Sequence, residues 1–326
     1  MKALGSCAVA LGLLLVGPTD ALAQAGTCSP ASGLTSCLPA DNLWAHAHGA
    51  FAWVAPASPP AERELAVGVT TSWVHKPIGL TGSSAAPSGS TTYLVENAVT
   101  ATLAASFGLT SRLAFDVAAP FTLYQSGAGL GVLTGSSEEL PRSAVGEVRL
   151  GPSVTLLHRR ELDLAARLQV VAPTGSPRGF SRFASITFAP GLSTTYRMGR
   201  VGLGADLGAR LREAVTLGDA VIGHQVSLGL GATYDILGER WLTVGAEAVA
   251  LFGLDARRSV GSDSTGADPG GEPLIPAEWL VSFATGRLLD GKLRARVGMG
   301  GALPTGGASD VTAPLLRTVA LLSFTP

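Results

Sequence analysis

The sequence contains few charged residues and, beyond its first two dozen positions, no long hydrophobic run. No apolar stretch there reaches the roughly 18 residues that a membrane-spanning helix requires. Charged residues make up 14% of the chain and its formal net charge is -1, so we expect no contact with nucleic acid. The mean hydropathy is nevertheless +0.35. A positive value without a spanning helix is typical of apolar residues that alternate with polar ones along many strands.

The first residues have the pattern of an export signal. Lys2 precedes an apolar run over Ala8–Val16, and Ala21–Ala23 has the small residues of a cleavage site. We therefore predict a secretory signal peptide over residues 1–23, because its apolar core is too short to span a bilayer.

Cysteine is scarce, with three in the whole chain. Cys7 falls in the predicted signal peptide, and Cys28 and Cys37 lie close together in the exported part. Oxidising compartments favour pairing of such cysteines, so we predict a disulfide between Cys28 and Cys37. A loop this short should add only about 2–3 kcal/mol to stability.

Residues 24–63 show little periodicity and much proline, which indicates an irregular N-terminal segment. The segment contains His46 and His48. Two imidazoles without a nearby carboxylate or thiol make a poor metal site, so we interpret both as ordinary loop histidines and expect no metal or other cofactor.

A strict two-residue alternation dominates the rest of the chain. In Val201–Arg212 every odd-numbered residue is apolar, whereas the even-numbered residues are Gly, Asp or Arg. Strand side chains alternate with this period, so one face is apolar and the other polar. About twelve segments fit the pattern: Glu64–Lys76, Thr92–Phe107, Thr110–Tyr124, Ala144–Leu157, Leu162–Ala172, Ser185–Arg197, Arg200–Arg212, Gln225–Leu237, Trp241–Phe252, Glu278–Leu289, Lys292–Leu303 and Leu315–Phe324. Each is long enough to cross a bilayer as a tilted strand.

Short and long connections alternate between these segments. The short turns are Phe107–Thr110, His158–Glu161, Met198–Gly199, Gly238–Glu239 and Asp290–Gly291. The long loops are Pro77–Thr91, Gln125–Ser143, Pro173–Ala184, Glu213–His224, Leu254–Ala277 and Pro304–Pro314. Outer-membrane barrels have short periplasmic turns and long extracellular loops, whereas a soluble sandwich has no reason for this alternation.

The sequence therefore predicts an all-β fold, an up-and-down antiparallel transmembrane barrel of about twelve strands over residues 64–326. We expect it in the outer membrane of a Gram-negative bacterium, surrounded by lipid, with both termini and the 24–63 segment in the periplasm. The last strand, Arg317–Phe324, is similar to the C-terminal signal that the barrel assembly machinery recognises, although Val319 stands where that signal often has glycine.

Several segments resemble the N-terminal barrel region of large OmpA-family outer-membrane proteins: Leu123–Leu130, Val171–Gly175, Ile186–Leu192, Ala209–Glu213 and Pro276–Leu280. The resemblance covers most of Leu43 to Phe324 and its motifs are structural. Family members commonly continue into a peptidoglycan-binding domain, whereas this sequence ends after the predicted barrel, so we expect no wall-anchoring function to carry over.

Alternation places a set of charged residues on the inner face of the barrel: Glu96, Asp116, Glu147, Arg149, Asp163, Arg167, Asp206, Arg210, Arg212, Asp235, Glu247, Arg294, Arg296 and Arg317. One interpretation is a passive porin-like channel for small hydrophilic solutes, in which arginines such as Arg210 and Arg212 serve passing anions. The alternative is a structural or surface barrel whose lumen is closed by salt bridges. A remote third is an outer-membrane hydrolase, but no histidine falls beside a serine at mid-strand on the outer face, so we expect no enzyme.

Overall fold

The computed structural model describes residues 28, 34–82, 90–135, 137, 139–217, 220–236, 241–254, 257–258, 272–286, 288–289, 291–304 and 313–325. The predicted signal peptide, the Gly238–Glu239 turn and Asp290 lie outside these residues. No helix among the described residues has the length and apolar character needed to cross a membrane.

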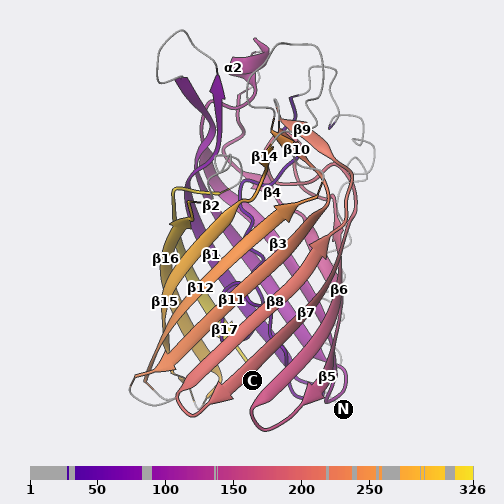
Figure 1. Cartoon of the computed structure of the whole chain (residues 1–326), viewed down its shortest axis with the longest axis vertical. Coiled ribbons are helices and arrows are strands. Elements are labelled where there is room, and N and C mark those ends of the chain that lie inside the picture. The colour runs from indigo at the N-terminus through magenta and orange to yellow at the C-terminus, as the bar shows by residue number, and fades with distance from the viewer. Residues whose placement is uncertain are drawn as a thin grey trace.

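Twelve long antiparallel strands close into a barrel, as the sequence predicts (Figure 1). They are β1 (Leu65–Gly82), β2 (Ser90–Gly108), β3 (Leu113–Ser126), β5 (Val148–His158), β6 (Leu162–Ala172), β7 (Thr187–Met198), β8 (Val201–Arg210), β11 (Gln225–Asp235), β12 (Leu242–Gly253), β15 (Ala277–Thr285), β16 (Leu293–Ala302) and β17 (Leu316–Phe324). Neighbours along the chain pair with each other. The barrel closes where β1 pairs with β17, from Val67 opposite Phe324 to His75 opposite Leu316.

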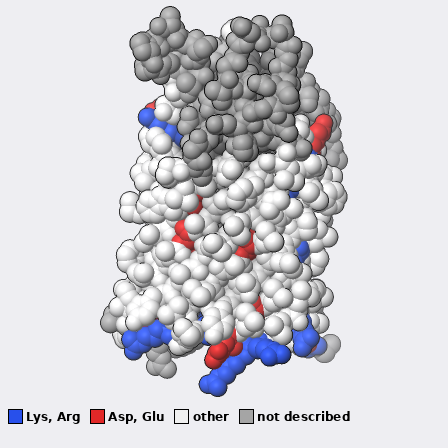
Figure 2. All heavy atoms as spheres, in the orientation of Figure 1, with Lys and Arg blue, Asp and Glu red and all other residues white. Residues whose placement is uncertain are grey.

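The outer wall of the barrel is apolar. Leu103, Leu207 and Val297 are each more than half exposed, and similar residues recur on the other strands. Such a surface would be unfavourable in water but matches the hydrocarbon core of a membrane. Figure 2 shows the result as a wide band of mostly uncharged residues with a few charged ones within it, and lysine and arginine gathered at the end that carries the short turns.

Short elements lie toward the opposite end, in the long loops. They are β4 (Ala144–Val145), which pairs with β3 of the barrel sheet, α2 (Gly131–Thr134), and the pairs β9 (Val215–Leu217) with β10 (Ala220–Ile222) and β13 (Arg257–Arg258) with β14 (Glu272–Pro273). By the rule for outer-membrane barrels, this is the extracellular end and the short turns are periplasmic.

The first two strands continue further than alternation predicts. The sequence suggested a loop over Pro77–Thr91, whereas β1 extends to Gly82 and β2 begins at Ser90. Register shifts on either side of Ile78 separate this extension from the regular part of the pair. Ile78 is fully buried in a cluster with residues of the outer loops, and this packing accounts for the extension.

The N-terminal segment differs most from expectation. It is irregular, but its described residues 34–63 run through the inside of the barrel (Figure 1, indigo) and not outside it in the periplasm. Leu34 bridges to Leu217 at the extracellular end, and at the periplasmic end the backbone of Glu64 accepts a hydrogen bond from Gly108. The chain therefore passes through its own barrel before β1 begins. We call residues 34–63 the lumen segment.

Candidate functional site

The contacts between the barrel wall and the lumen segment form the candidate site. Glu247 on β12 is central to them. Its carboxylate accepts backbone hydrogen bonds from Ala52 at 2.8 Å, Trp53 at 2.8 Å and Val54 at 3.3 Å. A buried carboxylate without partners would be costly, and three donors satisfy it here. The guanidinium of Arg296 lies 3.8 Å from the same carboxylate.

Arg296 also contacts the lumen segment directly. Its guanidinium donates hydrogen bonds to the backbone oxygen of Ala50 and to the hydroxyl of Ser282, the latter at 2.9 Å. Arg296 and Glu247 thus bind consecutive parts of the segment, one through carbonyl oxygen and the other through N–H groups.

Phe51 lies against two glycines of the wall, and the fit requires glycine. A Cβ atom added to Gly204 would stand 2.4 Å from the Phe51 ring, and one added to Gly231 would stand 2.6 Å from it. Both positions face inward by alternation along β8 and β11. The absence of side chains there makes room for the ring inside the barrel.

Arg317 on β17 fastens the outer half of the segment. Its guanidinium donates to Glu278 of β15 at 2.7 Å, to Asp41 of the lumen segment at 2.7 Å and to Ser72 of β1 at 2.8 Å. Arg317 is 0% exposed, so its charge depends on these acceptors.

Trp44 lies between two arginines of the wall. The guanidinium carbon of Arg149 is 5.0 Å from its ring centroid and that of Arg210 is 4.1 Å away. Arg210 also donates to the side chain of Asn42 at 3.5 Å. The cation–π contacts place two of the predicted arginines against the segment and not against open water.

Further residues that the sequence predicted to face inward make contacts in the upper lumen. Arg167 donates two hydrogen bonds to Asp206, and the carboxylate of Glu147 accepts one from the backbone N–H of Phe183. Arg212 lies over the Phe183 ring, 3.4 Å from its centroid. Arg167 and Asp206 link strands β6 and β8 of the wall, and the contacts to Phe183 join the wall to the loop between β6 and β7.

An apolar cluster closes the extracellular end. It combines loop and strand residues with two residues of the lumen segment, Leu38 and Ala40, and includes Phe180, Phe183, Leu217, Ile222, Leu274, Leu94 and Ile78. Cys28 and Cys37 form a disulfide there, with their Cα atoms 5.4 Å apart. An N–H group of Arg182 points at the Cys28 sulfur, 3.3 Å away.

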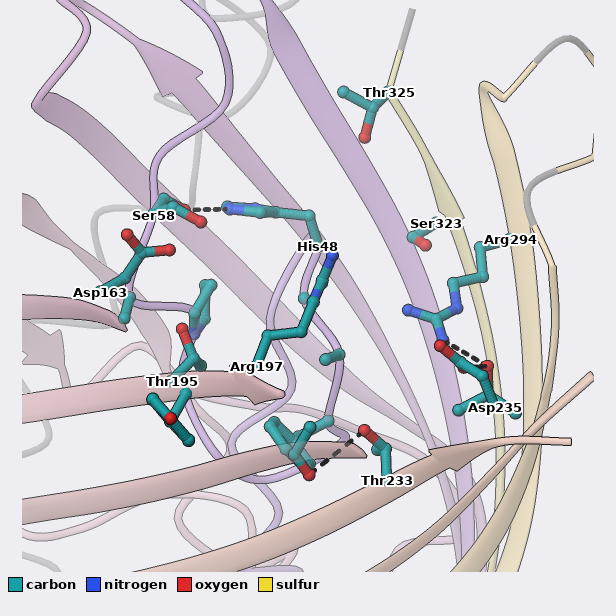
Figure 3. A pocket seen from close by; sticks show the side chains of 18 of the residues that line it. His48, Ser58, Asp163, Thr195, Arg197, Thr233, Asp235, Arg294, Ser323 and Thr325 are labelled. Atoms are coloured by element: carbon teal, nitrogen blue, oxygen red, sulfur yellow. Dashed lines mark hydrogen bonds between the residues drawn. The ribbon is translucent and has the colours of Figure 1, made fainter. Parts of the chain in front are cut away.

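The lumen has very different amounts of free space at its two ends. A cavity of about 1340 Å³ opens at the periplasmic end, which we call the vestibule. Figure 3 shows polar side chains from opposite walls, such as Arg197 and Arg294, directed into it beside His48 of the lumen segment. Toward the outside, a second cavity near Trp44 and Trp53 holds only about 50 Å³.

Asp163, Asp235 and Arg294 line the vestibule, which places them apart from the upper contacts. Asp116 lies opposite the buried Ser106 on the inward face. Glu96 is the exception, since it is exposed. Register shifts between β1 and β2 interrupt the alternation from which its inward position was derived, so Glu96 does not join the cluster.

Sequence reasoning missed several residues of the site. Glu278 has the inward parity of its strand and could have been found by alternation. Asp41, Trp44 and Phe51 belong to the lumen segment, which was placed outside the barrel. Two tryptophans in so short a stretch, Trp44 and Trp53, were the available sign of a buried segment.

His48 of the lumen segment contacts the backbone of the same segment. The Nε2 atom of His48 lies 3.0 Å from the backbone oxygen of Ser58. Within the described part of the chain, no group of three or more His, Cys, Asp or Glu side chains could hold a metal ion.

Comparison with known proteins shows the fold. No protein-family model and no curated protein sequence matches the chain. Among solved structures, the COG4313 outer membrane channel from Pseudomonas putida F1 is similar over 83% of this chain and 98% of its own, with 13% identity and a TM-score of 0.58. The NanC porin and the KdgM porin each match over 79% of this chain and 98% of theirs, with 10% and 7% identity and TM-scores of 0.46. The chain thus has the closed twelve-strand barrel of an outer-membrane channel structure.

Proposed function

We propose that this protein is an outer-membrane channel for small solutes, closed at rest by its own lumen segment. The observation that carries the proposal is that the obstruction is not part of the wall. Residues 34–63 contribute no strand to the barrel, so the sheet can stay closed while the segment moves.

The contacts of the segment suit a closure that can be released. Residues such as Leu38 and Trp53 pack in apolar clusters, and the remaining contacts are hydrogen bonds, ion pairs and ring contacts to wall side chains such as Glu247, Arg317 and Arg210. The vestibule of about 1340 Å³ already provides a path from the periplasm to the middle of the lumen. Only the part of the lumen segment in the outer half of the barrel must then move to give a continuous polar passage.

In this proposal the arginines have another role than in the sequence-based hypothesis, in which they serve passing anions. Arg210 and Arg212 hold Trp44, Phe183 and backbone groups in the closed state. They would become available to solutes only after the segment and the loop withdraw. Replacing them by glutamine should therefore alter opening as well as ion selectivity.

The direct test is solute uptake. Liposomes containing the full-length protein should swell in neutral sugars below a size limit. Liposomes with the Glu247→Gln variant should swell faster, because a neutral amide binds the backbone N–H groups of the lumen segment more weakly than the carboxylate does. Glu213→Gln, an exposed acid in an outer loop, serves as the control. If neither wild type nor Glu247→Gln admits any solute, the barrel is structural, as the alternative holds.

Location and assembly follow from the same proposal. The apolar band fits the outer membrane of a Gram-negative bacterium, and the signal peptide over residues 1–23 and recognition of Arg317–Phe324 by the barrel assembly machinery remain predictions. The resemblance to OmpA-family barrels also stays a prediction, because no family model matches.

A further inference from the structure

The vestibule carries an excess of positive charge. Its described lining includes the cations Arg159, Arg160, Arg197, Arg200, Lys292 and Arg294. The acids in the same lining are Glu64, Glu161, Asp163 and Asp235. Six permanent cations therefore face four carboxylates in one recess, before either histidine is counted.

The acids are largely engaged with neighbours in the barrel. The carboxylate of Asp163 lies 2.6 Å from the Nδ1 atom of His158, and that of Asp235 accepts a hydrogen bond of 2.6 Å from the Thr243 hydroxyl. Glu161 accepts the hydroxyl of Tyr196 at 3.4 Å. These contacts orient the carboxylates toward groups of the wall, while the lining as a whole keeps more cations than acids.

Four of the cations are exposed at the mouth. Arg159 and Arg160 lie on the turn between β5 and β6, Arg200 on the turn between β7 and β8, and Lys292 on the turn between β15 and β16. None of the four forms an ion pair with a residue that the structure describes. Short turns hold their backbones in place around the opening.

We propose that the vestibule binds small multivalent anions, molecules that carry two or more carboxylate or phosphate groups. Arginine suits both groups because its planar donors can bind two oxygens at once. Cations on separate turns favour an anion with several charged groups. A recess with an excess of positive charge also raises the local concentration of anions. As a statement about the transported solute, this inference rests on the channel function proposed above.

The binding is tested without transport. Calorimetry on the full-length protein in neutral detergent, with inorganic pyrophosphate and with tricarballylate as probes, should show binding that weakens as salt rises. The double variant Arg159→Gln/Arg160→Gln should bind about tenfold more weakly, because it loses charged hydrogen bonds. The matched control is Arg112→Gln, an exposed arginine on the β2–β3 turn that does not line the vestibule.

A lipid headgroup could supply the same phosphate chemistry, so a second arm separates the sources. The protein is placed in nanodiscs of zwitterionic lipid with and without phosphatidylglycerol. Competition of the anionic lipid with pyrophosphate, lost in the Arg159→Gln/Arg160→Gln variant, assigns the cations to headgroups and overturns a free-solute site. Pyrophosphate binding that is equal in both discs supports the proposal.

Failure of the two proposals can be told apart. Anion binding in a protein that admits no solute would leave the vestibule site intact and refute the channel function. Solute uptake without any anion binding, or equal binding by the double variant and wild type, would overturn the vestibule site alone.

Discussion

The carboxylate of Glu247 accepts a hydrogen bond from the backbone nitrogen of Trp53, 2.8 Å away. This bond joins the barrel wall to a residue 194 positions earlier in the chain. The same carboxylate also binds the N–H groups of Ala52 and Val54. A side chain that alternation directs into a lumen thus holds the part of the chain that fills it.

Arg317 should be important for stability. Replacement by glutamine would leave Glu278 and Asp41 buried without their cation, and breaking a buried pair in this way typically costs about 3–5 kcal/mol. Urea unfolding of the refolded protein, followed by the gel shift between folded and boiled forms, measures the loss. The exposed Arg159→Gln variant should unfold like wild type, and equal unfolding of Arg317→Gln would refute the assigned role.

Gly231 should not tolerate a side chain. A Cβ atom there would stand 2.6 Å from Phe51, so Gly231→Val must displace the ring or distort β11. We expect easier opening in swelling assays, and the additional change Phe51→Ala should restore the stability of the barrel by removing the clash. No stability difference between Gly231→Val alone and the Gly231→Val/Phe51→Ala pair would show that the ring does not occupy this position.

The Cys28–Cys37 disulfide should lie on the extracellular side of the membrane. Both cysteines are buried at the end with the long loops, so their labelling requires local opening of that end. After reduction of intact cells, a maleimide on a polymer too large for porins should label the freed thiols slowly. The original expectation of a periplasmic segment gives the opposite result, labelling only after the outer membrane is permeabilised.

Loss of the disulfide should have a modest effect. Replacing both cysteines by serine is expected to lower the stability of the outer closure by about 2–3 kcal/mol, because the closed loop is short. Limited proteolysis should then cleave the lumen segment faster than in wild type, whereas the barrel strands stay protected. Unchanged cleavage would mean that the apolar cluster around Leu38 and Phe180 fixes this end alone.

Residue alternation predicts the structure correctly wherever the sheet is regular. It located strands, turns and inward charges such as Asp206 and Arg317, because a buried face and a lipid face impose opposite chemistry on neighbouring residues. It misplaced Glu96, where register shifts interrupt the period. It also ended β1 too early, because contacts with distant loops stabilise the extension beyond His75.

The position of the lumen segment inside the barrel could not be predicted from residue alternation. The segment has no period, and its packing depends on glycines such as Gly204 and Gly231 that in sequence resemble any small inward residue of a strand. Its polar partners are supplied by the wall, from residues more than 190 positions away in the case of Glu247. A local pattern contains no information about such pairings.

Single-channel recording in planar bilayers tests the central claim most directly. Wild-type protein should stay closed for most of the time with brief openings, and Glu247→Gln should be open for a much larger fraction of the time. Its single-channel conductance should be similar to that of wild type, because the number of strands and the width of the barrel are unchanged. Glu213→Gln should behave like wild type. A steady open conductance in wild type, or an identical open fraction in wild type and Glu247→Gln, would contradict closure by the lumen segment.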